Sequence, residues 1–189
     1  MRKLADGNCW MTQNLRLVGP RTLTASDSDV ATSFTLPASN SSAWCSNTTE
    51  ECVNQILLFD SNDNQYGVYY NWRVATAGTG TYLTPTGQNA PSSICSRGWR
   101  LPTGGSAGEL KSLGIQYNSS ASLQDVPGFI LGGIRDGNTV SGRTIEGGYW
   151  SSTSNGNVGA NRLSLNTTGM NDESNHYKYT GESIHCVAQ

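Results

Sequence analysis

The five cysteines of this 189-residue chain limit its fold more than any other feature of the sequence. Cys45 and Cys52 enclose a short polar stretch, so a bond between them would close a small ring. Cys95 and Cys186 both stand in apolar or aromatic surroundings, far apart in the sequence. Cys9 is then the residue left over. We therefore predict two disulfides and one buried thiol, a combination that is typical of exported proteins.

Zinc binding is the alternative use for these cysteines. A structural zinc site needs four Cys or His ligands at characteristic spacings, commonly with a Cys-x-x-Cys pair. The sequence contains no Cys-x-x-Cys, and its two histidines, His176 and His185, are not paired. The cysteine spacing therefore favours disulfides over a metal site.

Disulfides matter in this chain because its apolar core must be thin. Hydrophobic residues make up 35% of the chain and charged residues 14%, while glycine occurs 22 times. A chain of this length can still form one compact domain with a core. We expect scattered aromatic side chains and long loops in that domain. In the chain-entropy model, a bond between Cys95 and Cys186 would contribute ~4–5 kcal/mol to its stability.

Charge and hydropathy exclude two kinds of partner. A net charge of −2 provides no basic surface for nucleic acid. The longest strongly apolar stretch, Ile56–Phe59, is far shorter than the ~20 residues of a membrane-spanning helix, so we predict no membrane insertion. Residues 1–6 lead into no apolar segment, so the sequence shows no signal peptide, and we expect it to be part of a longer protein.

The segment 148–187 combines an apolar frame with a polar, aromatic face. Leu163 and Leu165 alternate with Arg162, Ser164 and Asn166, so the leucines should face inward and the other three residues outward. A dense run of hydrogen-bonding side chains follows. Such a face suits recognition, since Tyr, Asn and Ser make adaptable contacts at low entropic cost. A hairpin whose polar side only faces water would show the same pattern.

Most of the preceding chain is predicted to form short strands and loops. Residues 9–17 have the pattern of a strand, and residues 18–45 that of an irregular loop. Residues 127–135 predict an apolar strand interrupted by glycines, which allow another backbone to approach closely. The Asp-Gly-Asn sequence at residues 136–138 predicts the turn that follows.

One helix is predicted near the middle of the chain. Ser106 is followed three residues later by Glu109, which is the pattern of a capping box at a helix start. Leu110 and Leu113 give this helix an apolar stripe, and Gly114 is its expected end.

A calcium site is the candidate cofactor site of this sequence. Asp60, Asn62 and Asn64 alternate in the manner of calcium-loop oxygen ligands. The glycine at the sixth loop position and the glutamate at the twelfth are absent. We predict no other metal or cofactor.

Five motifs occur in order along nearly the whole chain. They are Cys9-Trp10-Met11-Thr12-Gln13-Asn14-Leu15, Tyr69-Tyr70-Asn71-Trp72, Ile94-Cys95-Ser96-Arg97-Gly98-Trp99-Arg100-Leu101-Pro102-Thr103, Tyr149-Trp150-Ser151-Ser152-Thr153 and Ser183-Ile184-His185-Cys186-Val187. Together they resemble the Fibrobacter succinogenes major paralogous domain, which is found in bacterial exported and surface proteins.

That family is similar to C-type-lectin-like folds. The resemblance implies an α+β domain with short antiparallel strands, one or two helices and long irregular loops. It also implies a disulfide between Cys95 and Cys186. It carries no catalytic residues, and the calcium-binding Glu-Pro-Asn, Gln-Pro-Asp and Trp-Asn-Asp motifs of classical sugar lectins are absent from this sequence.

The family further resembles the variable proteins of diversity-generating retroelements. These proteins display a hypervariable C-terminal surface on a C-type-lectin-like scaffold, and their variation arises at adenines, chiefly in Asn codons. Residues 171–177 are rich in the amino acids that such changes produce, although any polar loop has this composition. The usual family ending has Arg and an aromatic or Leu residue where this chain has His185 and Glu182.

Catalysis is not indicated by the sequence. A hydrolase needs a nucleophile beside an oriented base. His185 precedes Cys186 on an expected strand and should point to the opposite face, while His176 lies in the polar run. The sequence contains no nucleophile elbow and no carboxylate pair that its pattern brings together. We predict that the chain is not an enzyme.

We predict a single domain over residues 1–189, with a scaffold at residues 1–147 and a binding segment at residues 148–189. Its expected function is adhesin-like or receptor-like binding of a protein or glycan on a cell or phage surface, through a hypervariable C-terminal surface like that of the variable proteins of diversity-generating retroelements. We expect the domain to be extracellular or on the cell surface, as part of a longer exported protein. The alternatives are a structural surface module without a diversified site and, less favoured, an enzyme.

The predicted contact residues lie on the terminal strands and loops: Arg162, Ser164, Asn166, Asn171, Asp172, Ser174, Asn175, His176, Tyr177 and Tyr179. Tyr177 and Tyr179 are the expected hot spots, because rigid amphipathic rings dominate such interfaces. Four tryptophans are assigned to the core: Trp10, Trp72, Trp99 and Trp150.

Overall fold

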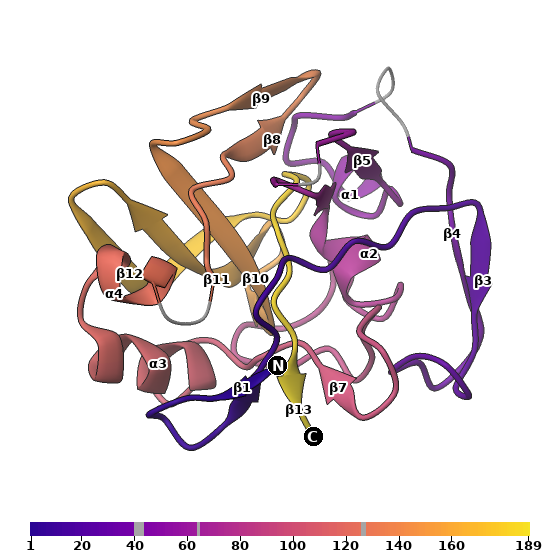
Figure 1. Cartoon of the computed structure of the whole chain (residues 1–189). Helices are drawn as coiled ribbons and strands as arrows, with labels where there is room; N and C mark the ends of the chain where they lie inside the picture. Colours follow the sequence, from indigo (N-terminus) through magenta and orange to yellow (C-terminus); the bar gives the residue numbers. More distant parts are fainter. Residues whose placement is uncertain (40–43, 64, 126–127) are drawn as a thin grey trace.

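The computed structural model describes residues 1–39, 44–63, 65–125 and 128–189. Within these residues, short strands alternate with short helices and long irregular connections (Figure 1). The architecture is therefore α+β, as the family resemblance implies, but the described residues contain four helices instead of the expected one or two. The helices are α1 (Glu50–Val53), α2 (Trp72–Ala75), α3 (Glu109–Tyr117) and α4 (Ser120–Asp125).

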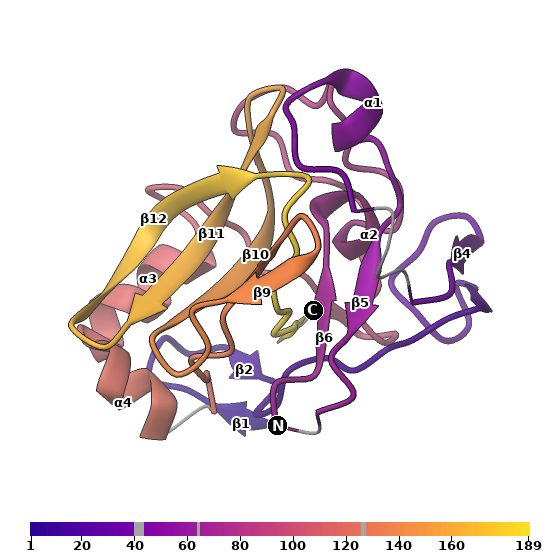
Figure 2. The same ribbon diagram turned by 90° about the horizontal axis from the view of Figure 1, so that it is seen from above.

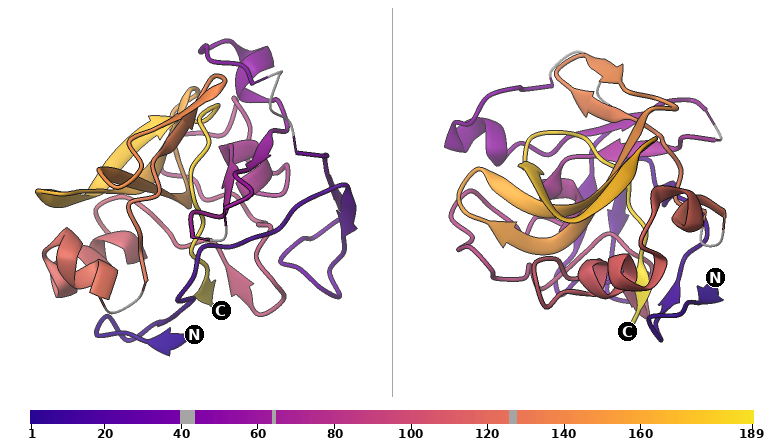
Figure 3. Two further views of the ribbon diagram at one scale, coloured as in Figure 1. Left: turned by 45° about the horizontal axis from the view of Figure 1, so that its top comes forward. Right: turned by 90° about the vertical axis from the view of Figure 1, so that its left-hand side faces the viewer.

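The longest strands form an antiparallel sheet near the C-terminus, which we call the terminal sheet. Its strands are β10 (Glu146–Asn155), β11 (Gly159–Asn166) and β12 (Gly169–Tyr177), in that spatial order. Helices α3 and α4 lie along one face of this sheet (Figures 2 and 3). The register shifts once between β11 and β12, after Arg162, so the alternation of side chains is interrupted there.

A second sheet joins the two ends of the chain. Its order is β1 (Arg2–Lys3), β2 (Cys9–Trp10), β13 (Val187–Ala188) and β7 (Trp99–Arg100). The first and last strands of the chain thus lie in one sheet, and both termini emerge on the same side of the molecule (Figure 1).

Three two-stranded pairings complete the strands of the described residues. They are β3 (Arg21–Leu23) with β4 (Phe34–Leu36), β5 (Leu58–Asp60) with β6 (Val68–Tyr70), and β8 (Ile134–Asp136) with β9 (Thr139–Ser141). The β3–β4 pair lies within the region predicted as irregular loop. That prediction is wrong for these six positions, where Leu23 and Leu36 are buried and give the pair an apolar anchor.

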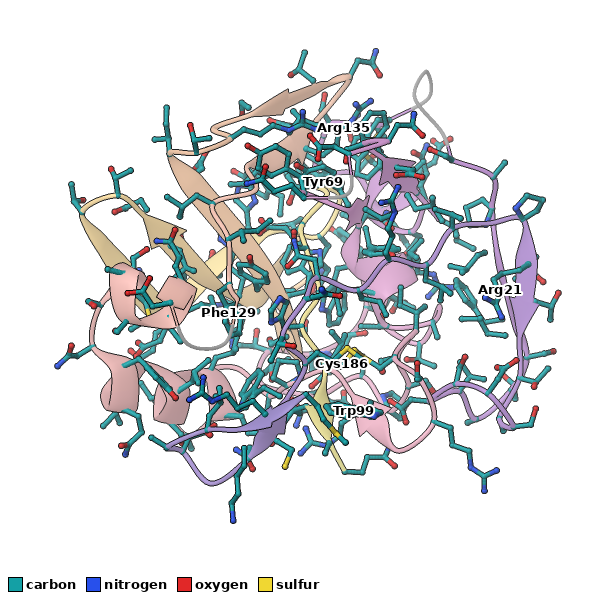
Figure 4. All side chains as sticks on the ribbon, viewed as in Figure 1. Arg21, Tyr69, Trp99, Phe129, Arg135 and Cys186 are labelled. Carbon is teal, nitrogen blue, oxygen red and sulfur yellow. A yellow bond between two sulfur atoms is a disulfide. The ribbon has the colours of Figure 1, made fainter. Side chains whose placement is uncertain are left out.

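Among the described residues, the core consists of two apolar clusters. One surrounds Trp72 and Trp150 and includes Cys95 and Cys186, while the other lies between the terminal sheet and helices α3 and α4. Phe129 belongs to the second cluster, and Cys186 lies beside the half-buried Trp99 (Figure 4). The core assignment is confirmed for Trp10, Trp72 and Trp150, which are wholly buried.

Both predicted disulfides are present. Cys45 is bonded to Cys52 across 7 residues of sequence, and Cys95 is bonded to Cys186 across 91 residues. The thiol of Cys9 is free but only half-buried, which corrects the expectation of a buried thiol. Among the described residues, no helix is long and apolar enough to cross a lipid bilayer.

The main helix starts later than the capping-box pattern predicts. Helix α3 begins at Glu109, and Gly108 occupies the cap position, so Ser106 does not cap the helix. Thr103 takes that part instead, because its hydroxyl accepts the Glu109 N–H at 3.0 Å while the Glu109 carboxylate accepts the Thr103 N–H at 2.9 Å. Arg100 adds two hydrogen bonds of 2.7 Å to the same carboxylate. Leu110 and Leu113 are buried as predicted.

Two predicted strands are shorter in the structure. The first is limited to Cys9–Trp10, because the following residues bond to the C-terminal segment one at a time, for example Leu15 N–H to Ile184 O at 2.8 Å. In the described part of the glycine-interrupted stretch, residues 128–135, only residues from Ile134 onward form a strand. The turn predicted at residues 136–138 is confirmed, since it joins β8 to β9.

We expect the Cys95–Cys186 disulfide to contribute more to stability than the Cys45–Cys52 disulfide. Replacing Cys95 and Cys186 together by alanine should lower the free energy of unfolding by about 4–5 kcal/mol, because the bond closes a loop spanning 91 residues. The matched control replaces Cys45 and Cys52, which close a short ring, and should cost about 2–3 kcal/mol. Denaturant unfolding followed by tryptophan fluorescence measures both. Equal losses would contradict the loop-length argument.

His185 should make the fold sensitive to acid. Its ring lies 4.1 Å from the ring of Phe129 and 5.1 Å from that of Tyr149, and burial lowers the pKa of His185 to about 3. Below pH 6.5 the unfolded chain binds a proton at this residue and the folded chain does not, so stability falls as pH falls towards 3. We expect a loss of about 2 kcal/mol between pH 7 and pH 5.

The variant His185→Phe provides the comparison for this measurement. It keeps an aromatic ring in the cluster and removes the titrating group, so its unfolding free energy should change less over the same pH range. Urea unfolding of both proteins at pH 7, 6 and 5 measures the difference. Parallel pH profiles would show that His185 does not titrate on unfolding.

Candidate functional site

The candidate site lies on the terminal sheet, where β12 is the edge strand. Along β12 the side chains alternate between exposed and half-buried positions. The exposed ones include Asn171, Asn175 and Tyr177. These residue types provide amide groups and an aromatic ring on a strand whose geometry is fixed by its pairing with β11. This edge strand (Figure 2) therefore presents the polar, aromatic face that the sequence predicts.

Strand β11 anchors this face to the core. Leu163 and Leu165 are wholly buried against α3, α4 and Phe129, so the alternation that predicts them as inward residues is confirmed. At the outer end of β11, Asn166 accepts hydrogen bonds from its own turn, including the Thr168 N–H at 2.9 Å. Asn166 is exposed, and Ser164 is half-buried.

Arg162 does not lie at the surface, although the alternation predicts an outward position. It is 8% exposed, and its guanidinium contacts the Glu182 carboxylate at 2.5 Å. The same Glu182 oxygen lies 2.8 Å from Nδ1 of His176. A second bond, of 2.9 Å, joins this nitrogen to the Thr180 hydroxyl. This cluster ties β11 and β12 to the segment after the sheet, so Arg162 supports the surface from below.

Glycine at position 148 makes room for this cluster. Gly148 lies on β10 opposite Ser164, and a Cβ atom there would overlap the carboxylate of Glu182 and stand 3.0 Å from a nitrogen of Arg162. Because the charged groups occupy the space of the missing side chain, only glycine fits this position. Ser174, opposite Arg162 on β12, receives a 3.4 Å hydrogen bond from Arg162 Nε.

Asp172 faces helix α3 and not the open solvent. Its carboxylate lies 3.3 Å from Lys111 Nζ, and a Cβ at Gly114 of the helix would overlap it. Lys111 also contacts Glu173, at 3.4 Å. Gly114 therefore allows the strand to approach the helix, and it does not end the helix, which continues to Tyr117.

The two predicted hot-spot tyrosines differ in exposure. Their rings stack with centroids 5.2 Å apart, but Tyr177 is 45% exposed and Tyr179 only 6%. The carbonyl of Tyr179 accepts a 2.9 Å hydrogen bond from the Trp44 indole, which holds this residue in the interior. The expected surface position of Tyr179 is thus wrong, and its ring supports that of Tyr177.

The predicted contact residues therefore divide into three groups. Four are exposed, and we call them the terminal-sheet surface: Asn166, Asn171, Asn175 and Tyr177. Four are half-buried: Ser164, Asp172, Ser174 and His176. Arg162 and Tyr179 are buried. The structure brings most of them together on β11 and β12, but strand alternation and the register shift distribute them over both faces.

Lys178 is a site residue whose role the sequence does not reveal. It is wholly buried, and its ammonium donates hydrogen bonds to Thr81 O at 2.8 Å and Gly156 O at 2.7 Å. The ammonium also lies 4.6 Å from the Trp72 ring centroid. Burial lowers the pKa of Lys178 to about 8. Its place within a polar run gives no sign of burial, yet it fixes the β10–β11 turn beside the terminal-sheet surface.

The candidate calcium ligands are only partly within the described residues. Asn64 lies outside them. The Asp60 carboxylate accepts the Asn62 N–H at 3.0 Å and lies 3.5 Å from Arg16. Over the part of the chain that the structure describes, no group of three or more His, Cys, Asp or Glu residues could hold a metal ion. Calcium at this turn stays a prediction.

Comparison with protein families gives a match over nearly the whole chain. The model of the Fibrobacter succinogenes major domain matches residues 5–187. The matched range includes the five motifs, both disulfides and the whole terminal sheet. A search of curated proteins and a search of solved structures found no match.

The space at Gly148 gives a direct test of the charged cluster. We expect Gly148→Ala to lower the free energy of unfolding by more than about 3 kcal/mol, because the new methyl group displaces the buried Glu182 from Arg162. The control is Gly169→Ala on β12, where an added Cβ has nothing within 4 Å. It should change stability by less than about 1 kcal/mol. Similar effects in thermal or urea unfolding would contradict this assignment.

Proposed function

This chain belongs to the Fibrobacter succinogenes major domain family, and on that basis we propose that it is a ligand-binding domain of an exported protein. The observation that carries the proposal is the terminal-sheet surface. Its amide side chains and its tyrosine ring stand on two paired strands, β11 and β12, and the core holds β11 in place. We propose that this surface contacts the ligand, in an adhesin-like or receptor-like role.

The scaffold is proposed to be C-type-lectin-like. Three features support this: the pairing of β2 near the N-terminus with β13 near the C-terminus, the long disulfide between Cys95 and Cys186, and the long irregular connections. In such a scaffold the pairing of the chain ends leaves the loops and the terminal sheet on the far side free to carry recognition.

The rigidity of the terminal-sheet surface favours a role in ligand recognition over that of a hairpin whose polar side only faces water. Tyr177 rests on Tyr179, and the buried carboxylate of Glu182 holds His176 from below. Side chains that are ordered before binding lose less entropy when a ligand arrives. Asn and Tyr side chains can also form hydrogen bonds and stacking contacts with many kinds of partner.

We propose that the ligand is a protein or glycan on another cell or a phage, and that the domain acts outside the producing cell. Two disulfides support an extracellular location, since such bonds persist in oxidising compartments. The net charge of −2 and the polar face argue against nucleic acid and against membrane insertion by this segment.

We further propose that the surface is diversified by a retroelement that changes adenines. Asn codons are the chief targets of such variation, and three of the four residues of the terminal-sheet surface are Asn. The structure also separates positions that could vary freely from positions that could not. Arg162 and Glu182 belong to the buried charged cluster, so changes there would destabilise the scaffold.

Deep sequencing of the 3′ end of this gene in one clonal population tests the proposal. We expect substitutions only at adenine positions of codons 148–187, most often at the terminal-sheet surface, and rarely at the buried Glu182. Flanking DNA should contain a near-copy of the segment and a reverse transcriptase gene. Codons 1–147 of the same reads are the internal control, because they encode the scaffold.

An invariant segment would contradict diversification and would leave a fixed-specificity adhesin or a structural surface module. Substitutions spread evenly over codons 1–187 would contradict it as well. The enzyme alternative instead requires a reacting group beside a base in a cleft.

A further inference from the structure

A cavity lies where β12 ends, beside the turn between β10 and β11. Its volume is about 320 Å³, at the small end of the ~300–1,000 Å³ range of ligand pockets. It is lined by Asn155, Val158, Gly159, Asn175, His176 and Tyr177. The lining combines two amide side chains, an imidazole, an aromatic ring and a small apolar part. Among these lining residues, none is Asp, Glu, Lys or Arg.

The walls of this cavity are fixed in place before a ligand arrives. On one side, the Lys178 ammonium donates a 2.7 Å hydrogen bond to the carbonyl of Gly156. The Asn155 amide donates a 3.0 Å hydrogen bond to Asn161. On the other side, Tyr177 stacks on the buried Tyr179. The turn and the strand end therefore form a rigid frame, which lowers the entropic cost of binding.

The imidazole of His176 has a defined orientation. Its Nδ1 lies 2.8 Å from the Glu182 carboxylate, which only accepts hydrogen bonds, so the proton of the neutral ring resides on Nδ1. The Thr180 hydroxyl lies 2.9 Å from the same nitrogen and donates to Tyr177 O. In that tautomer the other ring nitrogen, Nε2, is a hydrogen-bond acceptor.

We propose that this cavity binds one neutral sugar ring at the end of a glycan, without calcium. A pyranose ring has an apolar C–H face that can lie on the Tyr177 ring, and hydroxyl groups at its edge that both donate and accept hydrogen bonds. The Asn155 and Asn175 side chains supply donors and acceptors, and His176 supplies an acceptor. The proposal rests on the proposed function, since it names the ligand class of the same surface.

Other small ligands match the cavity less well. A charged ligand would find no Asp, Glu, Lys or Arg among the six lining residues, so its desolvation would not be compensated. A purely apolar ligand would offer no partner to the hydrogen-bonding positions of the amides and the imidazole that the protein itself leaves open. A neutral ring with hydroxyl groups satisfies both the aromatic ring and the polar groups.

The test is a titration of the ¹⁵N-labelled chain, residues 1–189, with single sugars followed by NMR. The probes are glucose, galactose, mannose and N-acetylglucosamine, their methyl glycosides, and the charged sugars glucuronate and N-acetylneuraminate. We expect at least one neutral sugar to shift the backbone amides of residues 155–159 and 175–177 saturably, with a Kd of about millimolar order. An equally tight methyl glycoside identifies a glycan end as the source, and binding of only the free sugar identifies a free monosaccharide.

Variants separate the cavity from the rest of the surface. Asn175→Ala and Tyr177→Ala should each weaken binding by about tenfold or more, while Tyr177→Phe keeps the ring and should retain most of the affinity. The matched control is Glu173→Gln, at an exposed position of the same strand that neither lines the cavity nor belongs to the terminal-sheet surface, and it should leave the Kd unchanged. Unchanged amide spectra away from the substitution show that each variant is folded.

Three results would overturn the inference: no saturable shift with any neutral sugar, tighter binding of a charged sugar, or equal binding by the Tyr177→Ala and Glu173→Gln variants. Its failure can be told from failure of the proposed function. If the gene segment is diversified but the chain binds no sugar, only the glycan inference is contradicted. Sugar binding at this cavity in an invariant segment would support the inference and end the proposal of diversification.

Discussion

The fold depends on one buried segment near the C-terminus, residues 182–187. The backbone of this segment forms hydrogen bonds with several elements that are far apart in the sequence. Glu182 exchanges two 3.0 Å hydrogen bonds with Tyr70 of β6, and Ser183 bonds to β10 on both sides. Val187 then lies between β2 and β7. An unpaired buried backbone group costs about as much as a lost hydrogen bond. The segment 182–187 therefore holds the otherwise separate sheets together.

The same segment sets the chemistry of the terminal sheet. Its first residue, Glu182, carries the carboxylate that Arg162 and His176 share, so one position serves both the backbone network and the charged cluster. A buried ion pair adds little net stability by itself but fixes a geometry strongly, since leaving one partner unpaired is costly. The exposed side chains of β12 thus stand on a charged support that tolerates little rearrangement.

Short sequence patterns predicted the structural features that depend on neighbouring residues alone. The alternation around Leu163 and Leu165 indicated the buried face of β11, because a period of two follows from strand geometry alone. The short spacing of Cys45 and Cys52 indicated one disulfide, and the apolar surroundings of Cys95 and Cys186, together with the family resemblance, indicated the other. Contacts between distant segments were missed. Alternation predicted that Arg162 faces outward, yet its contact with Glu182 buries it. Helix α3 takes its cap from Thr103, which is further from Glu109 than the three-residue spacing of a capping box.

The Cys95–Cys186 bond also decides how the molecule responds to a mechanical pull. All of β10, β11 and β12 lies inside the covalent loop that this bond closes. Tension applied to the two ends of the chain passes through the sulfur atoms and bypasses the enclosed residues. Until the bond is reduced, stretching can extend the first part of the chain but cannot draw out the strands that carry the exposed amides and the tyrosine ring.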